Sequence, residues 1–251
     1  MRNYDKGIQG NNFIFGTRAV IEAIDAGKDI EKVLVQKGLQ NELIKELISK
    51  MKSLKIPYNP VPLEKLNRLT RKNHQGVICY LSPIQFHSLD NIIETAYSKG
   101  KDPFLVILDR ITDVRNFGAI ARTMECAGAD ALVMQSKGNA LIGGDAMKTS
   151  AGALNILPVC REENLKKSMS TLKATGIRLV GCTEKTEQLI YDADLKGPLA
   201  IILGSEEDGI SPEYLKLCDD LVKIPMAGKI ESLNVSVSAG VILYEALRQR
   251  R

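Results

Sequence analysis

Three short stretches of this chain combine glycine with hydrogen-bonding side chains, and each directly follows an apolar run. The first runs from Asp109 to Thr123 and contains Asn116, Gly118 and Arg122. On a helix that begins near Asn116, the side chains of Asn116 and Arg122 lie about one and two-thirds turns apart and can both address the neighbouring strand ends. A capping asparagine and a solvated arginine would explain the same pattern without any site.

The second stretch is the apolar run Leu199–Leu203 followed by Gly204, Ser205 and Glu206. Glycine lets the backbone approach a ligand closely. The glutamate would place a carboxylate at the carboxyl edge of a sheet, where open α/β folds bind ligands. An ordinary strand and turn with surface acids would also fit this segment.

The third stretch, residues 224–237, places Ser232 or Asn234 at the start of a helix. That helix has an apolar stripe made of Leu233, Val237, Val241 and Tyr244. The free backbone N–H groups at a helix start are available to a ligand. Capping explains Ser232 and Asn234, but it does not explain three glycine- and polar-rich loops that each follow a strand within one domain.

The elements that hold these loops alternate between strands and helices. The expected strands are Phe104–Leu108, Ala131–Met134, Arg178–Gly181, Leu199–Leu203 and Leu221–Ile224, separated by segments with helical patterning. Such alternation predicts an α/β fold with a mainly parallel sheet covered by helices.

A smaller α/β unit of about eighty residues is expected in front of this sheet. Its elements are a helix capped by Thr17, a strand at Lys32–Val35, a helix from Asn41, a short helix over Leu63–Leu69 and a strand at Gly76–Tyr80. Ser82-Pro83 is a natural break, because the residue before proline is pushed out of the helical region. We predict domains over residues 1–82 and 89–251, joined by a linker at residues 83–88.

The composition is that of a folded protein, with 44% hydrophobic and 25% charged residues among 251. The net charge of +4 would suit a polyanionic partner but does not identify one. Neither a signal peptide in the polar residues 1–10 nor a run of roughly 18 apolar residues is found, so we expect neither export nor a membrane span. The five cysteines form no C-x-x-C pair and lie near no histidine cluster, which predicts a reduced, cytoplasmic setting and no metal site.

The three stretches resemble, in order and spacing, the three motifs of the SpoU class of the SPOUT methyltransferases. The matching segments are Asn116 through Arg122, Gly204-Ser205-Glu206, and Ile224-Pro225-Met226 with Ser232-Leu233-Asn234. This similarity covers about residues 103–251. Residues 11–82, including Gly16, Ala19 and His74-Gln75-Gly76-Val77, resemble the family's substrate-binding domain, which is like ribosomal protein L30e.

The resemblance implies a C-terminal α/β trefoil-knot domain behind the L30e-like domain, and a homodimer whose active site uses both subunits. It implies S-adenosyl-L-methionine as the cofactor, bound in the knot by Gly204, Ile224, Met226, Ser232 and Leu233. The implied activity is RNA ribose 2′-O-methylation, and resemblance to the bacterial 23S rRNA guanosine 2′-O-methyltransferase subfamily implies a guanosine of 23S rRNA as its target. A transfer RNA substrate is the alternative within the same class.

The implied catalytic residues are Arg122, Asn116, Glu206, Asn234 and Ser232. Arg122 matches the family's residue for activating the 2′-hydroxyl, but an arginine is effectively always protonated and is a poor base. We therefore expect it to stabilise the forming alkoxide, with a substrate phosphate as one possible proton acceptor. Asn116 and Glu206 would hold Arg122 and the ribose, and Asn234 would orient its loop. Cysteine-based methylation of a base carbon is disfavoured because no cysteine falls in a motif.

Two other classes of function compete with this interpretation. A non-catalytic RNA-binding protein of the same fold would have no need of all five catalytic side chains. A small-molecule α/β enzyme would leave the N-terminal domain and the missing phosphate-binding loop unexplained. The basic residues expected to contact RNA are Arg18, Arg68, Arg71 and Lys72, although such charges are also common on a solvated face.

Overall fold

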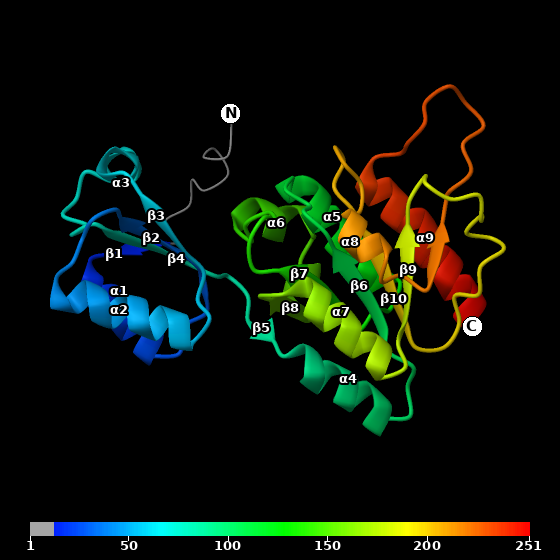
Figure 1. Ribbon diagram of the computed structural model, residues 1–251, viewed down its shortest axis with the longest axis horizontal. Helices are drawn as coiled ribbons and strands as arrows, with labels where there is room; N and C mark the ends of the chain where they lie inside the picture. Colours follow the sequence, from blue (N-terminus) through cyan, green and yellow to red (C-terminus); the bar gives the residue numbers. More distant parts are fainter. Residues whose placement is uncertain (1–12) are drawn as a thin grey trace. The chain divides into compact units, whose positions relative to one another are not determined.

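The computed structural model describes residues 13–251, which divide into two compact units (Figure 1). The first contains the chain up to Gln85 together with Ile142–Gly144, and the second contains Phe86–Leu141 and Asp145–Arg251. The predicted domain boundaries stay a prediction, and residues Phe86 and His87 of the predicted linker form a short strand, β5. Within the described residues, no helix is long and apolar enough to cross a bilayer.

The first unit is built on a four-stranded sheet in the order β1-β4-β2-β3, with β2 and β3 parallel and the other neighbours antiparallel. Its elements are β1 (Phe13–Phe15), α1 (Thr17–Asp25), β2 (Ile30–Gln36), α2 (Glu42–Ser53), β3 (Tyr58–Val61), α3 (Leu63–Leu69) and β4 (Val77–Leu81). Successive strand residues point to opposite faces, so Val33 of β2 packs with α1 and α2 while Leu34 packs with Leu66 of α3.

The prediction that Thr17 caps the first helix is wrong. Thr17 is the first residue of α1 and is buried, and the cap position belongs to Gly16. Gly16 has φ 94°, a conformation that favours glycine. The side-chain oxygen of Gln75 accepts the Thr17 N–H at 3.3 Å, so the start of α1 is held by a residue 58 positions later in the chain.

The second unit contains a seven-stranded parallel sheet in the order β11-β9-β10-β6-β7-β8-β5. Its strands are β5 (Phe86–His87), β6 (Phe104–Leu108), β7 (Ala131–Gln135), β8 (Val159–Glu162), β9 (Arg178–Cys182), β10 (Leu199–Leu203) and β11 (Asp220–Val222). Every residue of β6 and β10 is buried, as expected for central strands covered on both faces.

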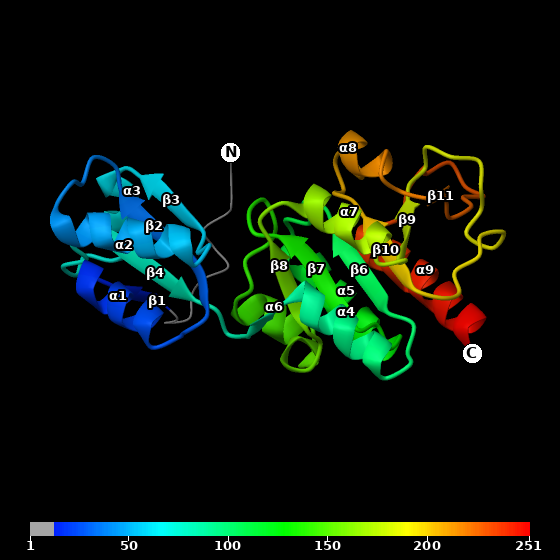
Figure 2. The same ribbon diagram turned by 60° about the horizontal axis from the view of Figure 1, so that its bottom comes forward.

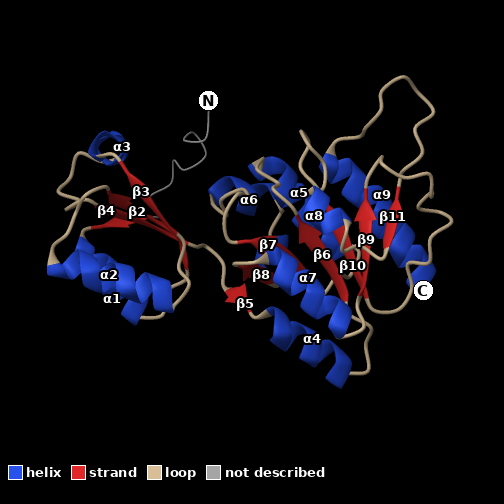
Figure 3. Ribbon diagram, in the orientation of Figure 1, coloured by secondary structure: helices blue, strands red, loops and turns tan. Residues whose placement is uncertain are grey.

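Helices cover both faces of this sheet (Figures 2 and 3). They are α4 (Leu89–Ser98), α5 (Val114–Cys126), α6 (Gly144–Thr149), α7 (Leu165–Ala174), α8 (Pro212–Leu215) and α9 (Val235–Arg250), with a short 3-10 helix at Ala153–Asn155. On one face, α4, α7 and Tyr214 of α8 pack against side chains from β6, β7, β9 and β10. On the other face, α5 and α9 pack against each other.

The apolar stripe predicted for the last helix is not its buried side. The residues of α9 that face the core are Val235, Ala239, Ile242, Leu243 and Ala246. The stripe residues Val237 and Tyr244 are 50% and 52% exposed, and Leu233 just before the helix is 38% exposed. The helix therefore carries apolar side chains on a second face that this chain leaves uncovered.

Strand order places a topological switch between β6 and β10. From β6 the chain proceeds through β7 and β8 in one direction, and β10 then pairs with the other side of β6. Open α/β sheets bind ligands outside the carboxyl ends of the strands at such a point. The loops after β6 and β10 are the ones that carry the first two predicted motifs.

Candidate active site

The helix α5, which follows β6, is capped by Asp113 and not by Asn116. The Asp113 carboxylate accepts the N–H groups of Arg115 at 2.7 Å and Asn116 at 3.0 Å, so Asp113 caps α5. The predicted helix start at about Asn116 is thus two residues late. Because Asp113 fills the capping role, the side chain of Asn116 is free to reach the neighbouring loops.

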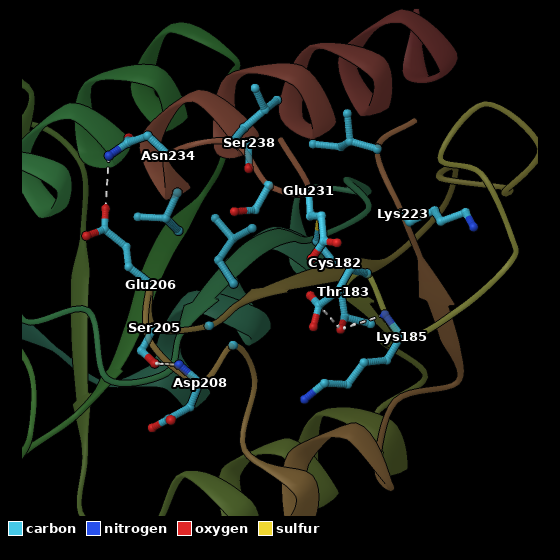
Figure 4. Close-up of a pocket in the computed structure, with 18 of the residues that line it drawn as sticks. Cys182, Thr183, Lys185, Ser205, Glu206, Asp208, Lys223, Glu231, Asn234 and Ser238 are labelled. Atoms are coloured by element: carbon cyan, nitrogen blue, oxygen red, sulfur yellow. Dashed lines mark hydrogen bonds between the residues drawn. The ribbon is translucent and has the colours of Figure 1, made fainter. Parts of the chain in front are cut away.

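Asn116, Glu206 and Asn234 form one hydrogen-bonded group, called here the amide–carboxylate cluster. The side-chain amides of Asn116 and Asn234 both donate to Oε1 of Glu206. The bond from Asn234 is 2.9 Å long and is drawn in Figure 4. The Asn234 amide also donates to the side-chain oxygen of Asn116 at 3.2 Å. One residue from each predicted motif therefore meets the other two, across up to 118 positions of chain.

Asn234 also caps the last helix. Its side-chain oxygen accepts the backbone N–H of Ser236 at 2.9 Å and the Ser236 hydroxyl at 2.6 Å. The prediction of a helix start at this residue is confirmed. The nitrogen of the amide serves the cluster and the oxygen serves the helix, so the start of α9 is fixed relative to Glu206.

Gly204 is required by the folding of its own loop. A Cβ atom there would overlap the backbone of Gly209 and Ile210, which turns back against it. Ser205 and Gly209 close this turn with two backbone hydrogen bonds of 3.1 and 3.0 Å. The predicted close approach at Gly204 is therefore an approach of protein backbone, and it directs Glu206 toward α5.

Two residues directly after β6 clamp the same turn. The buried Asp109 carboxylate accepts the backbone N–H and the hydroxyl of Ser211 at 2.7 and 2.6 Å. Arg110 donates to Asp109 at 3.2 Å, to Asp208 at 3.0 Å and to the Gly209 carbonyl at 3.1 Å. The hydrogen bond with Asp109 raises the pKa of the Arg110 guanidinium. Sequence reasoning assigned no role to either residue, although both stand at the carboxyl end of a predicted strand.

A pocket of about 1420 Å³ opens at the carboxyl ends of β9, β10 and β11. The predicted residues that line it are Gly204, Glu206, Ile224, Met226, Ser232, Leu233 and Asn234. Residues that sequence reasoning missed include Arg110, Cys182, Thr183, Lys185, Lys223, Glu231 and Ser238. Cys182 and Thr183 stand at the end of the strand predicted at Arg178–Gly181, and that position was the signal that could have found them.

Arg122 is not part of the amide–carboxylate cluster. It lies six residues after Asn116, which at 3.6 residues per turn directs its side chain roughly 120° away. Arg122 is exposed, and within residues 13–251 its side chain makes no hydrogen bond or ion pair. The expectation that Asn116 and Arg122 address the same strand ends is not met inside one chain.

The predicted RNA-contact residues Arg18, Arg68, Arg71 and Lys72 are all exposed in the first unit. Lys72 lies over the Phe15 ring, with its ammonium 5.9 Å from the ring centre. The hydrogen bond between Thr17 and Gln75 joins the segment that carries Arg18 to the segment that follows Arg71 and Lys72. The segments that carry Arg18, Arg71 and Lys72 are therefore held together, whereas Arg68 belongs to α3.

The cysteines do not form a nucleophilic centre. All five are free thiols, and Cys182 lines the pocket. Burial, reinforced by the neighbouring Glu184 charge, raises the pKa of Cys182 to about 12, which disfavours the reactive thiolate at neutral pH. Across the described part of the chain, no group of three or more histidine, cysteine or acidic side chains could hold a metal ion.

Comparison with known proteins identifies both parts of the chain. Residues 103–244 match the model of the SpoU rRNA methylase family. The chain belongs to this family. Residues 13–87 match the family of RNA 2′-O ribose methyltransferase substrate-binding domains. The predicted membership of the SpoU class is confirmed.

Two curated relatives extend this match. The 23S rRNA (guanosine-2′-O-)-methyltransferase RlmB of Photobacterium profundum is 37% identical over 247 residues, which are 96% of this chain and 99% of that protein. An uncharacterised tRNA/rRNA methyltransferase of Synechocystis is 36% identical over 95% of this chain. This SpoU methylase spans 63% of the length of the Synechocystis protein.

Solved structures share the fold. The SpoU methyltransferase AviRb from Streptomyces viridochromogenes, in complex with AdoMet, is similar with a TM-score of 0.60 and 27% identity, covering 94% of this chain and 89% of its own. The TrmH/SpoU tRNA modifying enzyme of A. aeolicus has a TM-score of 0.55 and 30% identity, covering 59% of this chain and 76% of its own. The predicted SPOUT-type α/β fold behind a small α/β substrate-binding domain and the predicted class of RNA methyltransferase are confirmed.

Proposed function

We propose that this SpoU methylase is an S-adenosylmethionine-dependent ribose 2′-O-methyltransferase that acts on a guanosine of 23S rRNA. The observation that carries the proposal is the amide–carboxylate cluster, of which Glu206 and Asn234 line a pocket formed by the second and third motifs. A protein of nearly the same length, RlmB of Photobacterium profundum, carries that activity in its name.

The pocket fits the charge of the cofactor. Its lining contains the five carboxylates of Glu184, Glu206, Glu207, Asp208 and Glu231 and the three cations of Arg110, Lys185 and Lys223. An excess of acid suits a ligand that bears a sulfonium and an ammonium group. The residues that would hold the cofactor are Gly204, Ile224, Met226, Ser232 and Leu233, which all line the pocket. When bound, S-adenosylmethionine supplies an electrophilic methyl group.

The amide–carboxylate cluster would position the ribose. Both amides donate to Oε1 of Glu206, so its other oxygen, Oε2, stays available to accept a hydrogen bond from a ribose hydroxyl. Ser232 lines the same pocket, and its hydroxyl can donate or accept a hydrogen bond. Holding the 2′-oxygen in line with the methyl group can remove much of the barrier to transfer.

Arg122 would stabilise the alkoxide that forms during the attack, with a substrate phosphate accepting the proton. Its guanidinium is free of partners within the described chain and is planar, so it can bridge a ribose oxygen and a phosphate. Because Arg122 points away from the cluster of its own chain, we propose that it completes the site of a second copy. The uncovered apolar face of α9, with Val237 and Tyr244, supports a homodimer.

The RNA substrate would be bound by the first unit through Arg18, Arg68, Arg71 and Lys72, in a chain divided into domains at 1–82 and 89–251. Ribosomal RNA is favoured over transfer RNA because the A. aeolicus tRNA modifying enzyme covers only 59% of this chain, whereas RlmB covers 96%. Transfer RNA methylation is the second candidate, supported by the mixed tRNA/rRNA name of the Synechocystis relative. A cytoplasmic location and independence of metal ions are part of the same proposal.

The test is a map of ribose methylation in cells that contain or lack this protein. We expect one 23S rRNA guanosine to lose its 2′-O-methyl group and to regain it when the intact gene is restored. The control is a strain that expresses the Arg122→Ala protein. Loss of a 2′-O-methyl group from transfer RNA alone would show that transfer RNA is the substrate. An unchanged methylation map in all strains would refute the proposal.

A further inference from the structure

We infer that Lys185 recognises the carboxylate of the cofactor's methionyl group, an inference that rests on the proposed function. The pocket contains three cationic side chains. Arg110 is bound to Asp109 and Asp208, and Lys223 is bound to Glu187 at 2.7 Å. Among the described residues, Lys185 has no acidic partner and is therefore the pocket cation left for a ligand.

The direction of the two lysine side chains distinguishes them. In Figure 4, Lys185 extends across the floor of the pocket toward Ser205 and Asp208, whereas Lys223 points away from the pocket. Asp208 is already engaged by Arg110 at 3.0 Å. The ammonium of Lys185 is thus held over the pocket without a neutralising partner there.

The backbone of Lys185 is anchored at the base of the pocket. Its N–H donates to the Thr183 hydroxyl at 3.3 Å, and Thr183 is buried. Thr183 in turn donates its backbone N–H to the Val222 carbonyl at 2.9 Å, which ties this loop to β11. The root of the side chain is thus fixed, and its charged end reaches into the pocket (Figure 4).

The carboxylate is the group of the cofactor that a free lysine would bind. S-adenosylmethionine has two cationic groups and one anion, the carboxylate. The acidic lining favours the cationic groups but repels the carboxylate, so a single free cation is needed to accept it. Lys185 supplies that cation at the opposite side of the pocket from the amide–carboxylate cluster (Figure 4). A backbone phosphate of RNA is the competing anion, and it makes a different prediction.

The experiment is calorimetric titration of the full chain with S-adenosylmethionine and with its decarboxylated analogue, which lacks only the carboxylate. Lys185→Met should weaken binding of S-adenosylmethionine about fivefold, the upper range for an exposed ion pair, and should leave binding of the analogue unchanged. Lys185→Arg should keep the wild-type preference for S-adenosylmethionine over the decarboxylated analogue. Lys223→Met, a lysine already paired with Glu187, is the matched control and should show the wild-type ratio of the two affinities.

The outcomes separate the two levels of inference. Failure of the wild-type protein to bind S-adenosylmethionine would refute the proposed function. Wild-type binding with an unchanged ratio in Lys185→Met would overturn the assignment of Lys185 alone. A loss of RNA affinity in Lys185→Met, with both small-molecule affinities unchanged, would assign the residue to a phosphate and would also overturn it.

Discussion

Asn234 donates its side-chain amide to Oε1 of Glu206 at 2.9 Å while the oxygen of the same amide caps α9. The two roles use different atoms of one side chain. They can therefore be separated by substitution, because aspartate retains the capping oxygen but has no N–H to donate.

Asn234→Asp should keep the cap of α9 and lose about a hundredfold in turnover, the scale of one positioned donor at an active site. The new carboxylate would also repel Glu206. Asn234→Ala should lose the same activity and, in addition, about 1 kcal/mol of stability through the missing cap. Single-turnover methylation and thermal unfolding measure the two effects. Turnover near the wild-type rate in the aspartate variant would remove the cluster from the mechanism.

Arg122→Ala should lower the single-turnover rate at saturating RNA by about a hundredfold, on the scale of about 3 kcal/mol for one transition-state donor. Cofactor affinity, measured by calorimetry, should barely change. Arg122→Lys should recover little, since an ammonium lacks the planar fork that bridges two oxygens. If the residue only docks RNA, the apparent KM should rise instead, with kcat unchanged.

Val237→Glu should convert a dimer to a monomer in light scattering, because it puts a charge on the uncovered apolar face of α9. Leu54→Glu is the matched control, since Leu54 is 58% exposed at the end of α2 in the other unit. That variant should stay dimeric. A monomeric wild-type protein in dilute solution would contradict both the interface and the shared active site.

Deleting residues 1–82 should leave the affinity for S-adenosylmethionine nearly intact and greatly reduce RNA methylation. The pocket is lined entirely by residues of the second unit, which explains the first expectation. Circular dichroism establishes that the truncated protein is folded before either measurement. A folded fragment that cannot bind the cofactor would refute the proposed division of labour.

Alkylation by iodoacetamide at pH 8 should modify the exposed Cys126 first. Burial raises the pKa of Cys79, Cys160 and Cys182 to about 12, so each exists almost wholly as the unreactive thiol at that pH. Raising the pH toward 12 increases the thiolate fraction and should speed their labelling. Mass spectrometry of the peptides measures the order in which the cysteines are labelled. Rapid labelling of Cys182 at pH 8 would reopen a nucleophilic role for it.

Much of the second unit's framework could be predicted because its central strands are unbroken apolar runs. β6 and β10 were predicted with both ends correct. The strands that were missed are β1, β3, β5 and β8, and all of them are short: β1 has three residues, β5 has two, and β3 and β8 have four each, with Pro60 inside β3. Such short strands form because they pair with a neighbouring strand, and the sequence alone does not indicate which strand that is.

The residues of the cluster were predictable from motif resemblance, but their contacts were not. Asn116 and Glu206 are 90 positions apart, and the period of a helix says nothing about which loop it meets. The pocket wall formed by Cys182, Thr183 and Lys185 was also missed, since these residues match none of the three motifs. Likewise, the apolar stripe on α9 was visible in the sequence, whereas its exposure depends on which helix face α5 covers.

The distance along the chain between Asn116 and Asn234 also determines when, during synthesis, the amide–carboxylate cluster can form. Their hydrogen bond spans 118 residues and needs the start of α9, which is synthesised after every other helix that the structure describes. Synthesis delivers domains from the N-terminus onward, and contacts so far apart in sequence close late in folding. The first unit can therefore be folded while the amide–carboxylate cluster is still incomplete. A nascent chain could hold RNA before it is able to modify it.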